Sequence, residues 1–321
     1  MSLTAVAVFA VAGCGTTSSS ASDVASYPDK NVTVIVPFGA GGGADSSFRA
    51  FQTVAEPLGP TITVTNVEGA GGVTGWTQFL NSEPDGYTLS LATPPFNIVP
   101  KLLQPESTPY SLDDFTYICT YSASPDTMYM NANETRFSDL DSLIAYAREN
   151  PGQVTAGVTG AVGTDAIHVY RLQDLAGIEL RMIPFDSATD VTAAVVSGDV
   201  DLSFSDLSWV TLAANDLSPV AIATEEPLTE HPDIPTYTQS GIDLVSVRLR
   251  SLSAQPGTPE QVLSYWEDIC RTVTDDPQFA AELGKTGQPV QFYDAQQTRD
   301  VVAQMTETIQ AVIDEQGLAT N

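Results

Sequence analysis

The sequence predicts an α/β protein in which two lobes are joined by strands that cross between them. Apolar strand patterns alternate with helical patterns along most of the chain, which is typical of a parallel sheet. Two of the expected strands, at 32–38 and 154–158, each run into a glycine-rich loop and then into the start of a helix. The length of 321 residues is sufficient for two lobes that each bury a core of their own.

The first half of the chain alternates strands and helices around two glycine loops. A strand leads into the loop at 39–44, and a second loop at 69–72 precedes another helix. Pro84-Asp-Gly86 is a turn that starts the next strand. The expected elements are strands 32–38, 61–66 and 87–92 with helices 45–58 and 73–81.

The second half continues this pattern, and its ends cross between the lobes. Crossings are expected near 115–130 and 235–252, and crossing strands form a hinge that suits closure over a ligand. The expected strands are 154–158, 180–184, 200–205, 220–223 and 244–253, and the expected helices are 140–149, 164–175, 191–197, 259–272, 277–284 and 294–316. The expected division is a signal and tether at 1–26, one lobe from 27–121 with 238–321, and a second lobe from 122–237.

Each glycine loop is expected to leave backbone N–H groups free where a helix starts. The loop at 39–44 reads Gly-Ala-Gly-Gly-Gly-Ala, and the loop at 159–163 reads Thr-Gly-Ala-Val-Gly. The first N–H groups of a helix have no partner within the helix, and the helix dipole favours negative charge there. Two such loops, one in each lobe, predict a cleft that grips one small anionic ligand.

Polar side chains close to these loops extend the expected site. Asp45 is expected to cap the first helix or, alternatively, to hold a bridging water or a ligand amino group. Thr164 is expected to cap the second helix while its hydroxyl stays available to a ligand. His168 lies one turn into the second helix, where it either lines the cleft or is exposed. Asp206 follows an expected strand and is either a cleft residue or a turn former.

The charge of the chain excludes two classes of partner. It has 12 basic and 40 acidic side chains, for a formal net charge of −28, so it repels nucleic acid and anionic lipid. An anionic ligand would be repelled too, but physiological salt limits that repulsion to a range of about 8 Å. The site is therefore expected to use amides and hydroxyls more than a cluster of cations.

The N-terminal residues resemble an export signal with a lipid-attachment cysteine. An apolar run at 3–12 leads to Val11-Ala-Gly-Cys14, and a tether rich in Ser, Thr and Ala follows at 15–26. The run is too short to span a bilayer, and no Lys or Arg precedes it. The predicted protein is thus lipid-anchored through Cys14 on the outer face of the cell membrane or in the periplasm. The alternative is a disordered tail with an incidental cysteine.

If Cys14 carries lipid, two cysteines remain for an oxidising compartment. Cys119 lies on an expected strand and Cys270 on an expected helix. They form either one disulfide or two unpaired buried thiols, because separation in the sequence says nothing about their distance in space.

Enzymatic and cofactor functions have weaker support in the sequence. Gly39, Gly41 and Ala44 satisfy a G-x-G-x-x-A pattern with Glu68 after the next strand, but the spacing is long for a dinucleotide site and an export signal argues against one. The chain lacks G-x-S-x-G, and its two histidines sit in unlike contexts, His231 being in a polar loop. Neither a Cys/His cluster nor a calcium-type acidic loop is present. We therefore expect no catalytic residue, no metal and no cofactor.

An ordered set of short motifs resembles the substrate-binding proteins of tripartite tricarboxylate transporters, the Bug or TctC-like family. The resemblance covers about residues 27–316. The motifs, in chain order, are Tyr27-Pro-x-Lys30, Val-Pro-Phe38 with the glycine loop and Asp45, Asn66-x-x-Gly-Ala-Gly-Gly72, Pro84-Asp-Gly-Tyr-Thr-Leu89, Gly160-x-x-Gly-Thr164 with His168, Ile183-Pro-Phe185, Ser197-Gly-Asp-Val-Asp-Leu202, Pro232-Asp-Ile-Pro-Thr236 and Pro256-Gly-Thr-Pro259.

The resemblance implies a type II periplasmic-binding-protein fold, a Venus flytrap, with two membrane transporter subunits as partners. It implies a small carboxylate as ligand, a monomeric receptor and no catalytic turnover. A sensory receptor and, with less support, an exported enzyme acting on a carboxylate stay open as alternatives. The residues expected to bind the ligand are Phe38, Gly41, Gly42, Gly43, Asp45, Thr93, Asn97, Gly160, Gly163, Thr164, Asp165, His168, Ser187, Asp206 and Arg250.

The chain departs from the family pattern at positions that bear on the ligand. Prolines are usual in the first loop where this chain has Gly39-Ala40. Asp186-Ser187 stands where the family has Lys or Arg followed by Gly, and an acid there would disfavour a highly charged ligand. On the returning strand, Arg250 is either a counter-ion in the cleft or an ordinary surface or hinge arginine.

Overall fold

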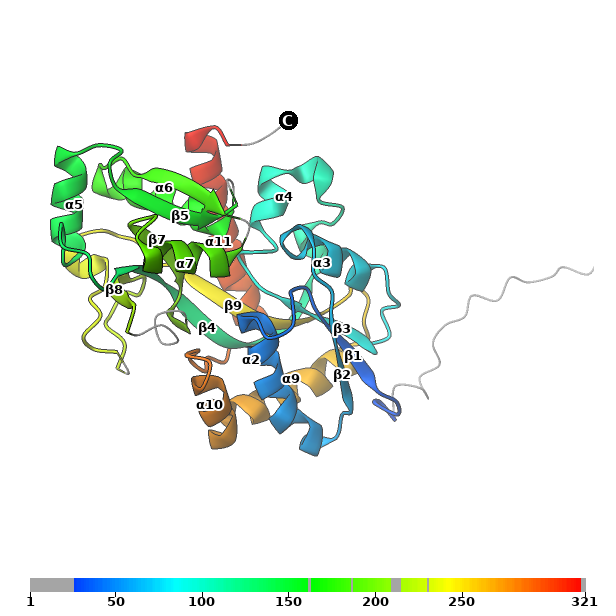
Figure 1. Ribbon diagram of the computed structural model, residues 1–321. Helices are drawn as coiled ribbons and strands as arrows, with labels where there is room; N and C mark the ends of the chain where they lie inside the picture. The colour runs from blue at the N-terminus through cyan, green and yellow to red at the C-terminus, as the bar shows by residue number, and fades with distance from the viewer. Residues whose placement is uncertain (1–25, 161–162, 186, 209–214, 230, 319–321) are drawn as a thin grey trace, which may run out of the picture.

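The computed structural model describes residues 26–160, 163–185, 187–208, 215–229 and 231–318. Within them the chain forms two lobes around one continuous, curled sheet with the strand order β2-β1-β3-β9-β4-β7-β5-β6, and β8 also pairs with β4 (Figure 1). The predicted α/β class with two lobes is confirmed. The expected signal segment and Cys14 lie outside the described residues.

The first lobe has a sheet that is parallel at one edge and antiparallel towards the centre. β1 is flanked by β2 and β3 in parallel, and β9 pairs antiparallel with both β3 and β4. Its strands are β1 (Val32–Val36), β2 (Ile62–Asn66), β3 (Thr88–Ala92), β9 (Val247–Ala254) and the first half of β4 (Thr116–Asn131). Its helices are α2 (Gly43–Ala55), α3 (Val73–Leu80), α4 (Val99–Leu103), α9 (Glu260–Asp275) and α10 (Pro277–Gly284), with short 3-10 turns η1 (Glu56–Leu58), η2 (Ala70–Gly72), η3 (Pro105–Ser107) and η4 (Leu112–Asp114).

The second lobe is built on the far half of β4. There β4 pairs antiparallel with β7 and β8, and β5 lies parallel to β6 and β7. The strands are β5 (Thr155–Thr159), β6 (Arg181–Phe185), β7 (Leu202–Asp206) and β8 (Leu217–Ile222). The helices are α5 (Leu140–Glu149), α6 (Thr164–Ala176) and α7 (Ala188–Ser197), and η5 (Thr238–Ser240) follows β8.

Strand β4 is the first of two connections between the lobes. Its pairing with β9 ends at Pro125, and its pairing with β7 begins at Asp126. On the return, Ile242 and Leu244 still pack in the core of the second lobe, and β9 starts at Val247. Both connections therefore cross at one place, which is where the chain is positioned to bend. The expected lobe boundaries stay a prediction.

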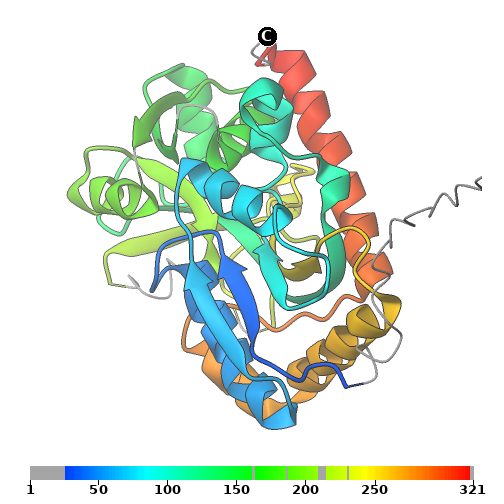
Figure 2. The ribbon, with the colours of Figure 1, turned by 90° about the vertical axis from the view of Figure 1, so that its right-hand side faces the viewer.

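The long C-terminal helix α11 (Ala295–Gln316) runs past both lobes, as two views at right angles show (Figures 1 and 2). It packs against α4 in the first lobe and against α6 in the second. Its buried Val302, Ile309 and Ile313 share a hydrophobic cluster with Leu249 of β9. This helix covers the apolar back of the crossing strands.

A disulfide joins Cys119 of β4 to Cys270 of α9, with the two Cα atoms 6.5 Å apart. Both residues lie in the main hydrophobic cluster of the first lobe, which includes Phe48, Phe51 and Trp266. Of the two alternatives that the sequence left open, the structure has the bridged one. The bond fastens α9 to the strand that crosses between the lobes.

Candidate functional site

The crossing strands have one polar face and one apolar face. Arg248 and Arg250 of β9 lie opposite Ser124 and Ser122 of β4, so these four side chains share a face. Leu249 points the other way, into the cluster beneath α11. Both arginines are only 5% exposed. A buried guanidinium requires partners, and the partners define the candidate site.

Arg248 joins the hinge to the second glycine loop. Its Nε donates to Asp126 at 2.5 Å, and one terminal nitrogen donates to Asp165 at 2.9 Å. Burial by itself raises the pKa of Asp126, but the charge of Arg248 and the hydrogen bonds from His168 and Ser246 outweigh it, so the pKa of Asp126 lies well below its usual range. Asp126 is therefore ionised across the physiological range of pH.

Arg250 lies between the first glycine loop and the end of β7. Its Nη2 donates to Asp206 at 3.2 Å and is 3.7 Å from the position that a Cβ atom would take on Gly43. Gln288 approaches the same spot and donates from Nε2 to the Gly43 carbonyl at 3.0 Å. Asp206 also accepts hydrogen bonds from Ser208. Arg250 thus contacts both lobes and is not a surface arginine.

The first glycine loop corrects the expected role of Asp45. The N-cap of α2 is Gly42, and Asp45 lies within the first turn, 1% exposed. Its carboxylate accepts the Gly41 N–H at 2.8 Å and also binds Arg49 and Asn66. The Gly41 amide is therefore occupied, and the Gly42 amide donates to the Gly39 carbonyl at 3.4 Å. Gly42 and Gly43 are both exposed at the helix start.

The second glycine loop follows the same plan. The N-cap of α6 is Gly163, so the expectation that Thr164 caps this helix is wrong. Asp165 accepts the Thr159 N–H at 3.1 Å and holds Arg248 with its other oxygen. A Cβ atom on Gly163 would lie 2.7 Å from the Thr159 carbonyl, so only glycine fits this cap. Each loop is thus tied by an aspartate of its own helix.

The two helix starts converge on adjacent arginines. Arg250 contacts the start of α2 at Gly43, and Arg248 contacts the start of α6 at Asp165. Side chains two positions apart on a strand lie on one face, about 7 Å apart. One small molecule is able to span that distance. The two loops therefore meet at one place, although they come from different lobes and are far apart in the sequence.

Of three other residues expected at the site, the side chains of Asn97 and Ser187 have structural partners of their own within the part of the chain that the structure describes, and that of Thr93 does not. Asn97 is buried and donates to the Tyr117 hydroxyl within the first lobe, which places its amide in the packed interior. Ser187 caps α7 and accepts the Asp190 N–H. Thr93 is buried and its hydroxyl has no partner among the described residues.

Phe38 and Gly160 border the two loops. The Phe38 ring packs edge-on against Phe96 and Trp76, next to the first loop. Gly160 has a φ of +76°, which favours glycine, and donates its N–H to Phe185. Asp186 lies outside the described residues.

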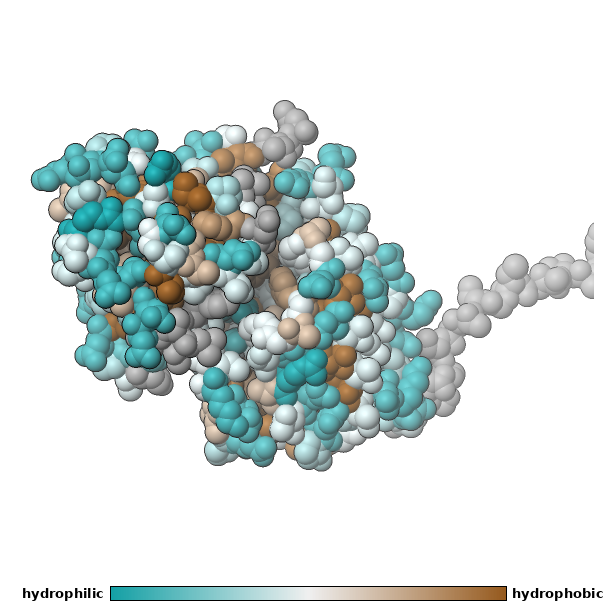
Figure 3. Space-filling model, viewed as in Figure 1, coloured by the Kyte–Doolittle hydropathy of each residue, from teal (hydrophilic) through white to brown (hydrophobic). Residues whose placement is uncertain are grey.

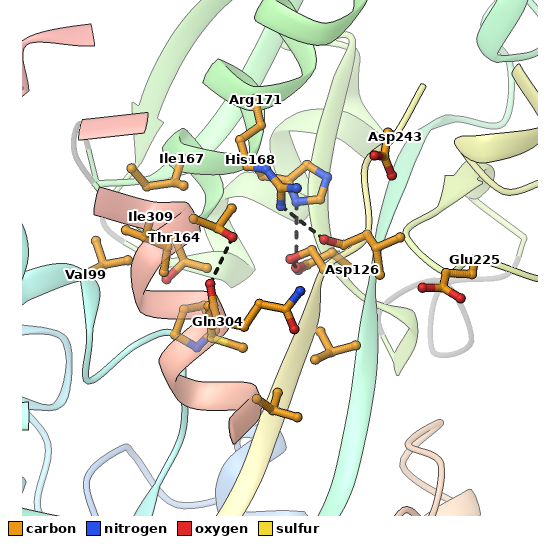
Figure 4. Close-up of a pocket in the computed structure, with 17 residues that line it drawn as sticks. Val99, Asp126, Thr164, Ile167, His168, Arg171, Glu225, Asp243, Gln304 and Ile309 are labelled. Carbon is orange, nitrogen blue, oxygen red and sulfur yellow. Dashed lines mark hydrogen bonds and ion pairs between the residues drawn. The ribbon is translucent and has the colours of Figure 1, made fainter. Parts of the chain in front are cut away.

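Thr164 and His168 line a cavity of about 400 Å³ behind the crossing strands, between α6 and α11. Figure 4 shows Thr164, Ile167 and Arg171 on one side of this cavity and Gln304 on the other. His168 is 3% exposed, so the alternative that it is exposed is wrong. Asp126 of the charged group lines this cavity too, whereas Arg248 and Arg250 do not, so the cavity adjoins the charged group without reaching the two arginines.

Burial lowers the pKa of His168, although the hydrogen bond and charge of Asp126 act against that shift. His168 Nδ1 lies 3.7 Å from an Asp126 oxygen, and its Nε2 has no partner among the described residues. The imidazole is therefore neutral at pH 7.

The sequence reasoning missed Arg248, Asp126 and Ser246, and it expected few cations in the cleft. Ser246 donates to the second Asp126 oxygen, which completes this buried group. The sequence does contain a signal, since Arg248 and Arg250 alternate with apolar residues on an expected strand. Such alternation predicts one charged face, but not that this face is buried.

Within the described residues, no helix is both long enough and apolar enough to cross a membrane. The same residues hold no group of three His, Cys, Asp or Glu side chains placed to bind a metal ion. Figure 3 shows hydrophilic side chains over most of one face of the molecule, in keeping with the acidic composition.

Two lobes on one sheet, joined by two crossing segments, define the class of periplasmic solute-binding proteins. The model of the tripartite tricarboxylate transporter family receptor, TctC, matches residues 48–318. The chain belongs to this family of periplasmic solute-binding receptors, and the predicted type II fold and resemblance are confirmed.

Curated relatives span most of the chain. The UPF0065 protein in the gbd 5' region of Cupriavidus necator is 26% identical over 91% of this chain and 89% of its own length. Protein BugT of Bordetella pertussis is 29% identical over 81% of this chain and 76% of its own length.

Solved structures show the same fold. R. palustris Rpa4515 with adipate has a TM-score of 0.81 at 21% identity, covering 91% of this chain and 99% of its own. MatC from Rhodopseudomonas palustris with bound malate has a TM-score of 0.77 at 23% identity, covering 89% of this chain and all of its own.

Proposed function

We propose that this receptor captures a small carboxylate between its two lobes and delivers it to a membrane transporter of the tripartite tricarboxylate type. The observation that carries the proposal is the convergence of two glycine-loop helix starts on neighbouring buried arginines. Helix starts and guanidinium groups both favour a carboxylate. Because each loop belongs to a different lobe, a ligand held by both would stabilise the closed arrangement.

In this proposal the exposed Gly43 amide seats the carboxylate next to Arg250, and the Gly42 amide joins it by exchanging its long 3.4 Å bond to the Gly39 carbonyl for the ligand. The N–H groups at Gly163 and Thr164 complete the seat from the second lobe. Two further ligand contacts are proposed at the borders of the loops, by Phe38 and Gly160. Contacts by Thr93, Asn97 and Ser187 stay hypotheses from the sequence. The Gly41 amide is not included, because Asp45 already occupies it.

The remaining parts of the proposal follow from the family and the N-terminal sequence. Two integral membrane subunits receive the ligand, and lipid on Cys14 holds the receptor at the membrane. The receptor acts as a monomer, without catalytic turnover. The four large hydrophobic side chains exposed among the described residues (Leu58, Leu175, Val196 and Val245) are scattered, which agrees with a monomer.

A ligand screen with the purified protein tests this function. Mono-, di- and tricarboxylates and acidic amino acids are compared with neutral amides of the same carbon skeletons, first by thermal unfolding and then by calorimetric titration. A ligand at a hundred times its dissociation constant adds about 2.7 kcal/mol to the free energy of unfolding, so a true ligand raises Tm clearly. We expect at least one carboxylate, and none of the amides, to bind. If neither technique detects binding of any carboxylate, the proposed function is wrong.

A further inference from the structure

The buried charges at the crossing strands do not balance. Asp126, Asp165 and Asp206 are at most 6% exposed, and they form ion pairs with two guanidinium groups, Arg248 and Arg250. All three carboxylates lie close together, because Asp126 and Asp206 are direct neighbours in the β4–β7 register and Asp165 shares Arg248 with Asp126. Arg171 also interacts with Asp126, but Asp243 interacts with Arg171 in turn. The four carboxylates therefore outnumber the three guanidinium groups by one.

The hydrogen bonds of this group are also unevenly distributed, because in the described part of the chain the aspartates are fully engaged and one arginine is not. Each of these aspartates already binds an arginine and a second donor, which is Ser246 for Asp126, the Thr159 N–H for Asp165 and Ser208 for Asp206. Arg250 is different: its Nη2 binds Asp206, but its Nε meets no acceptor among the described residues. The site therefore has one donor to spare for an acceptor, and it belongs to the same guanidinium group that Asp206 binds.

The loops themselves supply no further positive charge. Residues 38–45 contain no Lys or Arg, and neither do the stretches 161–162, 186 and 209–214, which lie outside the described residues. The next arginine along the first helix, Arg49, is engaged by Asp45. A second negative charge on a ligand held between the loops would therefore meet carboxylates and no cation supplied by the loops.

We propose that the cleft selects compounds with one carboxylate and no second negative charge, and that Asp206 is the residue that rejects a second carboxylate. This inference rests on the proposed function, since it concerns the ligand of the same site. Asp206 places a negative charge 3.2 Å from Nη2 of Arg250. Like charges repel strongly where water is excluded, so a dicarboxylate is penalised at this position.

The inferred preference for a single carboxylate differs from the ligands named with two structural neighbours. Adipate and malate, the compounds named with those structures, carry two carboxylates. At 21% and 23% identity these proteins share the fold with this chain, and the charges of the cleft can differ.

Ligands of equal chain length test the inference on the wild-type protein. Calorimetric titration compares hexanoate, 6-aminohexanoate and adipate, and then butyrate, 4-aminobutyrate and succinate. Within each series only the far end changes, from neutral to positive to negative. The series that binds better is used for the comparison. Its dicarboxylate should bind at least about tenfold more weakly than both the neutral-ended and the positive-ended compound. A tenfold loss is the effect that one neighbouring like charge produces. A dicarboxylate that binds as well as or better than its counterparts overturns the inference.

Substitution of Asp206 tests the assigned residue. Asp206→Asn keeps an oxygen for Ser208 and Arg250 and removes the charge, and Asp206→Ser serves if that variant does not fold. We expect the affinity for the dicarboxylate relative to its neutral-ended counterpart to rise about tenfold. Glu226→Gln, an exposed carboxylate of the second lobe, is the control for net charge and should leave the ratio unchanged.

An unchanged ratio in a folded Asp206 variant, or an equal rise in the Glu226→Gln control, contradicts the assignment to Asp206. If no compound of either series binds, nor any other carboxylate, the proposed function itself fails. That outcome is distinct from tight binding of dicarboxylates, which leaves the function intact and removes only this inference.

Discussion

His168 shows how one side chain is shaped by burial and by a charged neighbour. It packs against the rings of Phe204 and Tyr237, at 4.7 and 5.9 Å between centroids, and faces Asp126 with Nδ1. The carboxylate of Asp126 would stabilise a protonated imidazole here, but burial removes the water that would otherwise solvate its charge. Burial is the larger effect, and the pKa of His168 is lowered.

This lowered pKa predicts a pH dependence of stability. In the unfolded chain a histidine binds a proton below about pH 6.5, whereas His168 in the folded protein resists it until a lower pH. The free energy of unfolding should therefore decrease as the pH falls from about 6.5, by at most about 1.4 kcal/mol per pH unit from this residue. Urea unfolding between pH 7.5 and 5 should show a smaller decrease for His168→Gln than for wild type. His231→Gln replaces the other histidine and should behave as wild type. An equal decrease in the free energy of unfolding with falling pH in all three proteins would contradict the role given to His168.

At the scale of elements, β4 and β9 carry the hinge and the charged face together. Arg248 on β9 is the cation that holds both Asp126 on β4 and Asp165 at the start of α6. Burial acts to lower the pKa of Arg248, but the charges of Asp126, Asp165 and Asp206 outweigh it, and the pKa is raised further above its usual range. A buried ion whose partner is removed is costly, because the remaining charge has neither water nor counter-ion.

Arg248→Met should therefore destabilise the protein by about 3–5 kcal/mol, because Asp126 and Asp165 lose their shared cation. The matched control is Arg271→Met, which breaks a pair with Glu267 in which the arginine side chain is 53% exposed. Exposed pairs contribute about 0–1 kcal/mol, so this variant should unfold close to wild type in urea. Similar small losses in both variants would show that the buried group does not hold the hinge together.

The sequence predicts the elements well where patterns are long and local. The expected helix 164–175 is observed as α6, and the crossing expected at 115–130 is observed as β4. Helix α4 was not predicted, because Val99–Leu103 is short and contains a proline. The caps were misassigned to Asp45 and Thr164 because each helix starts on the preceding glycine loop.

The ion pairs of the site could not be predicted from the sequence. Arg248 and Asp126 are 122 positions apart, and Arg248 and Asp165 are 83 apart. Their proximity is set by strand register and by the packing of the second lobe, neither of which local patterns report.

At the scale of the whole molecule, the fold places two equivalent loop–helix units on either side of one hinge. The loops come from different lobes, and α11 covers the opposite, apolar side of the crossing strands (Figure 2). Movement of the lobes would change the distance between the helix starts while the arginines stay on β9. A ligand that bridges the loops is therefore coupled to closure by geometry alone.

Two locations compete for the carboxylate: the polar face between the loops and the cavity behind the hinge. The most direct test is a calorimetric comparison of Gly43→Leu, Gln304→Leu and wild type with the best carboxylate from the screen. Gly43 is exposed at the start of α2, and a Cβ there keeps an ordinary 3.7 Å contact with Arg250, whereas Gln304 lines only the cavity. We expect Gly43→Leu to weaken binding about tenfold or more, because the leucine side chain would fill the space of the ligand beside Arg250 and cost it about one charge-assisted hydrogen bond. Gln304→Leu should bind as wild type. Unchanged affinity in Gly43→Leu together with a loss in Gln304→Leu would place the ligand behind the hinge and contradict a site between the lobes.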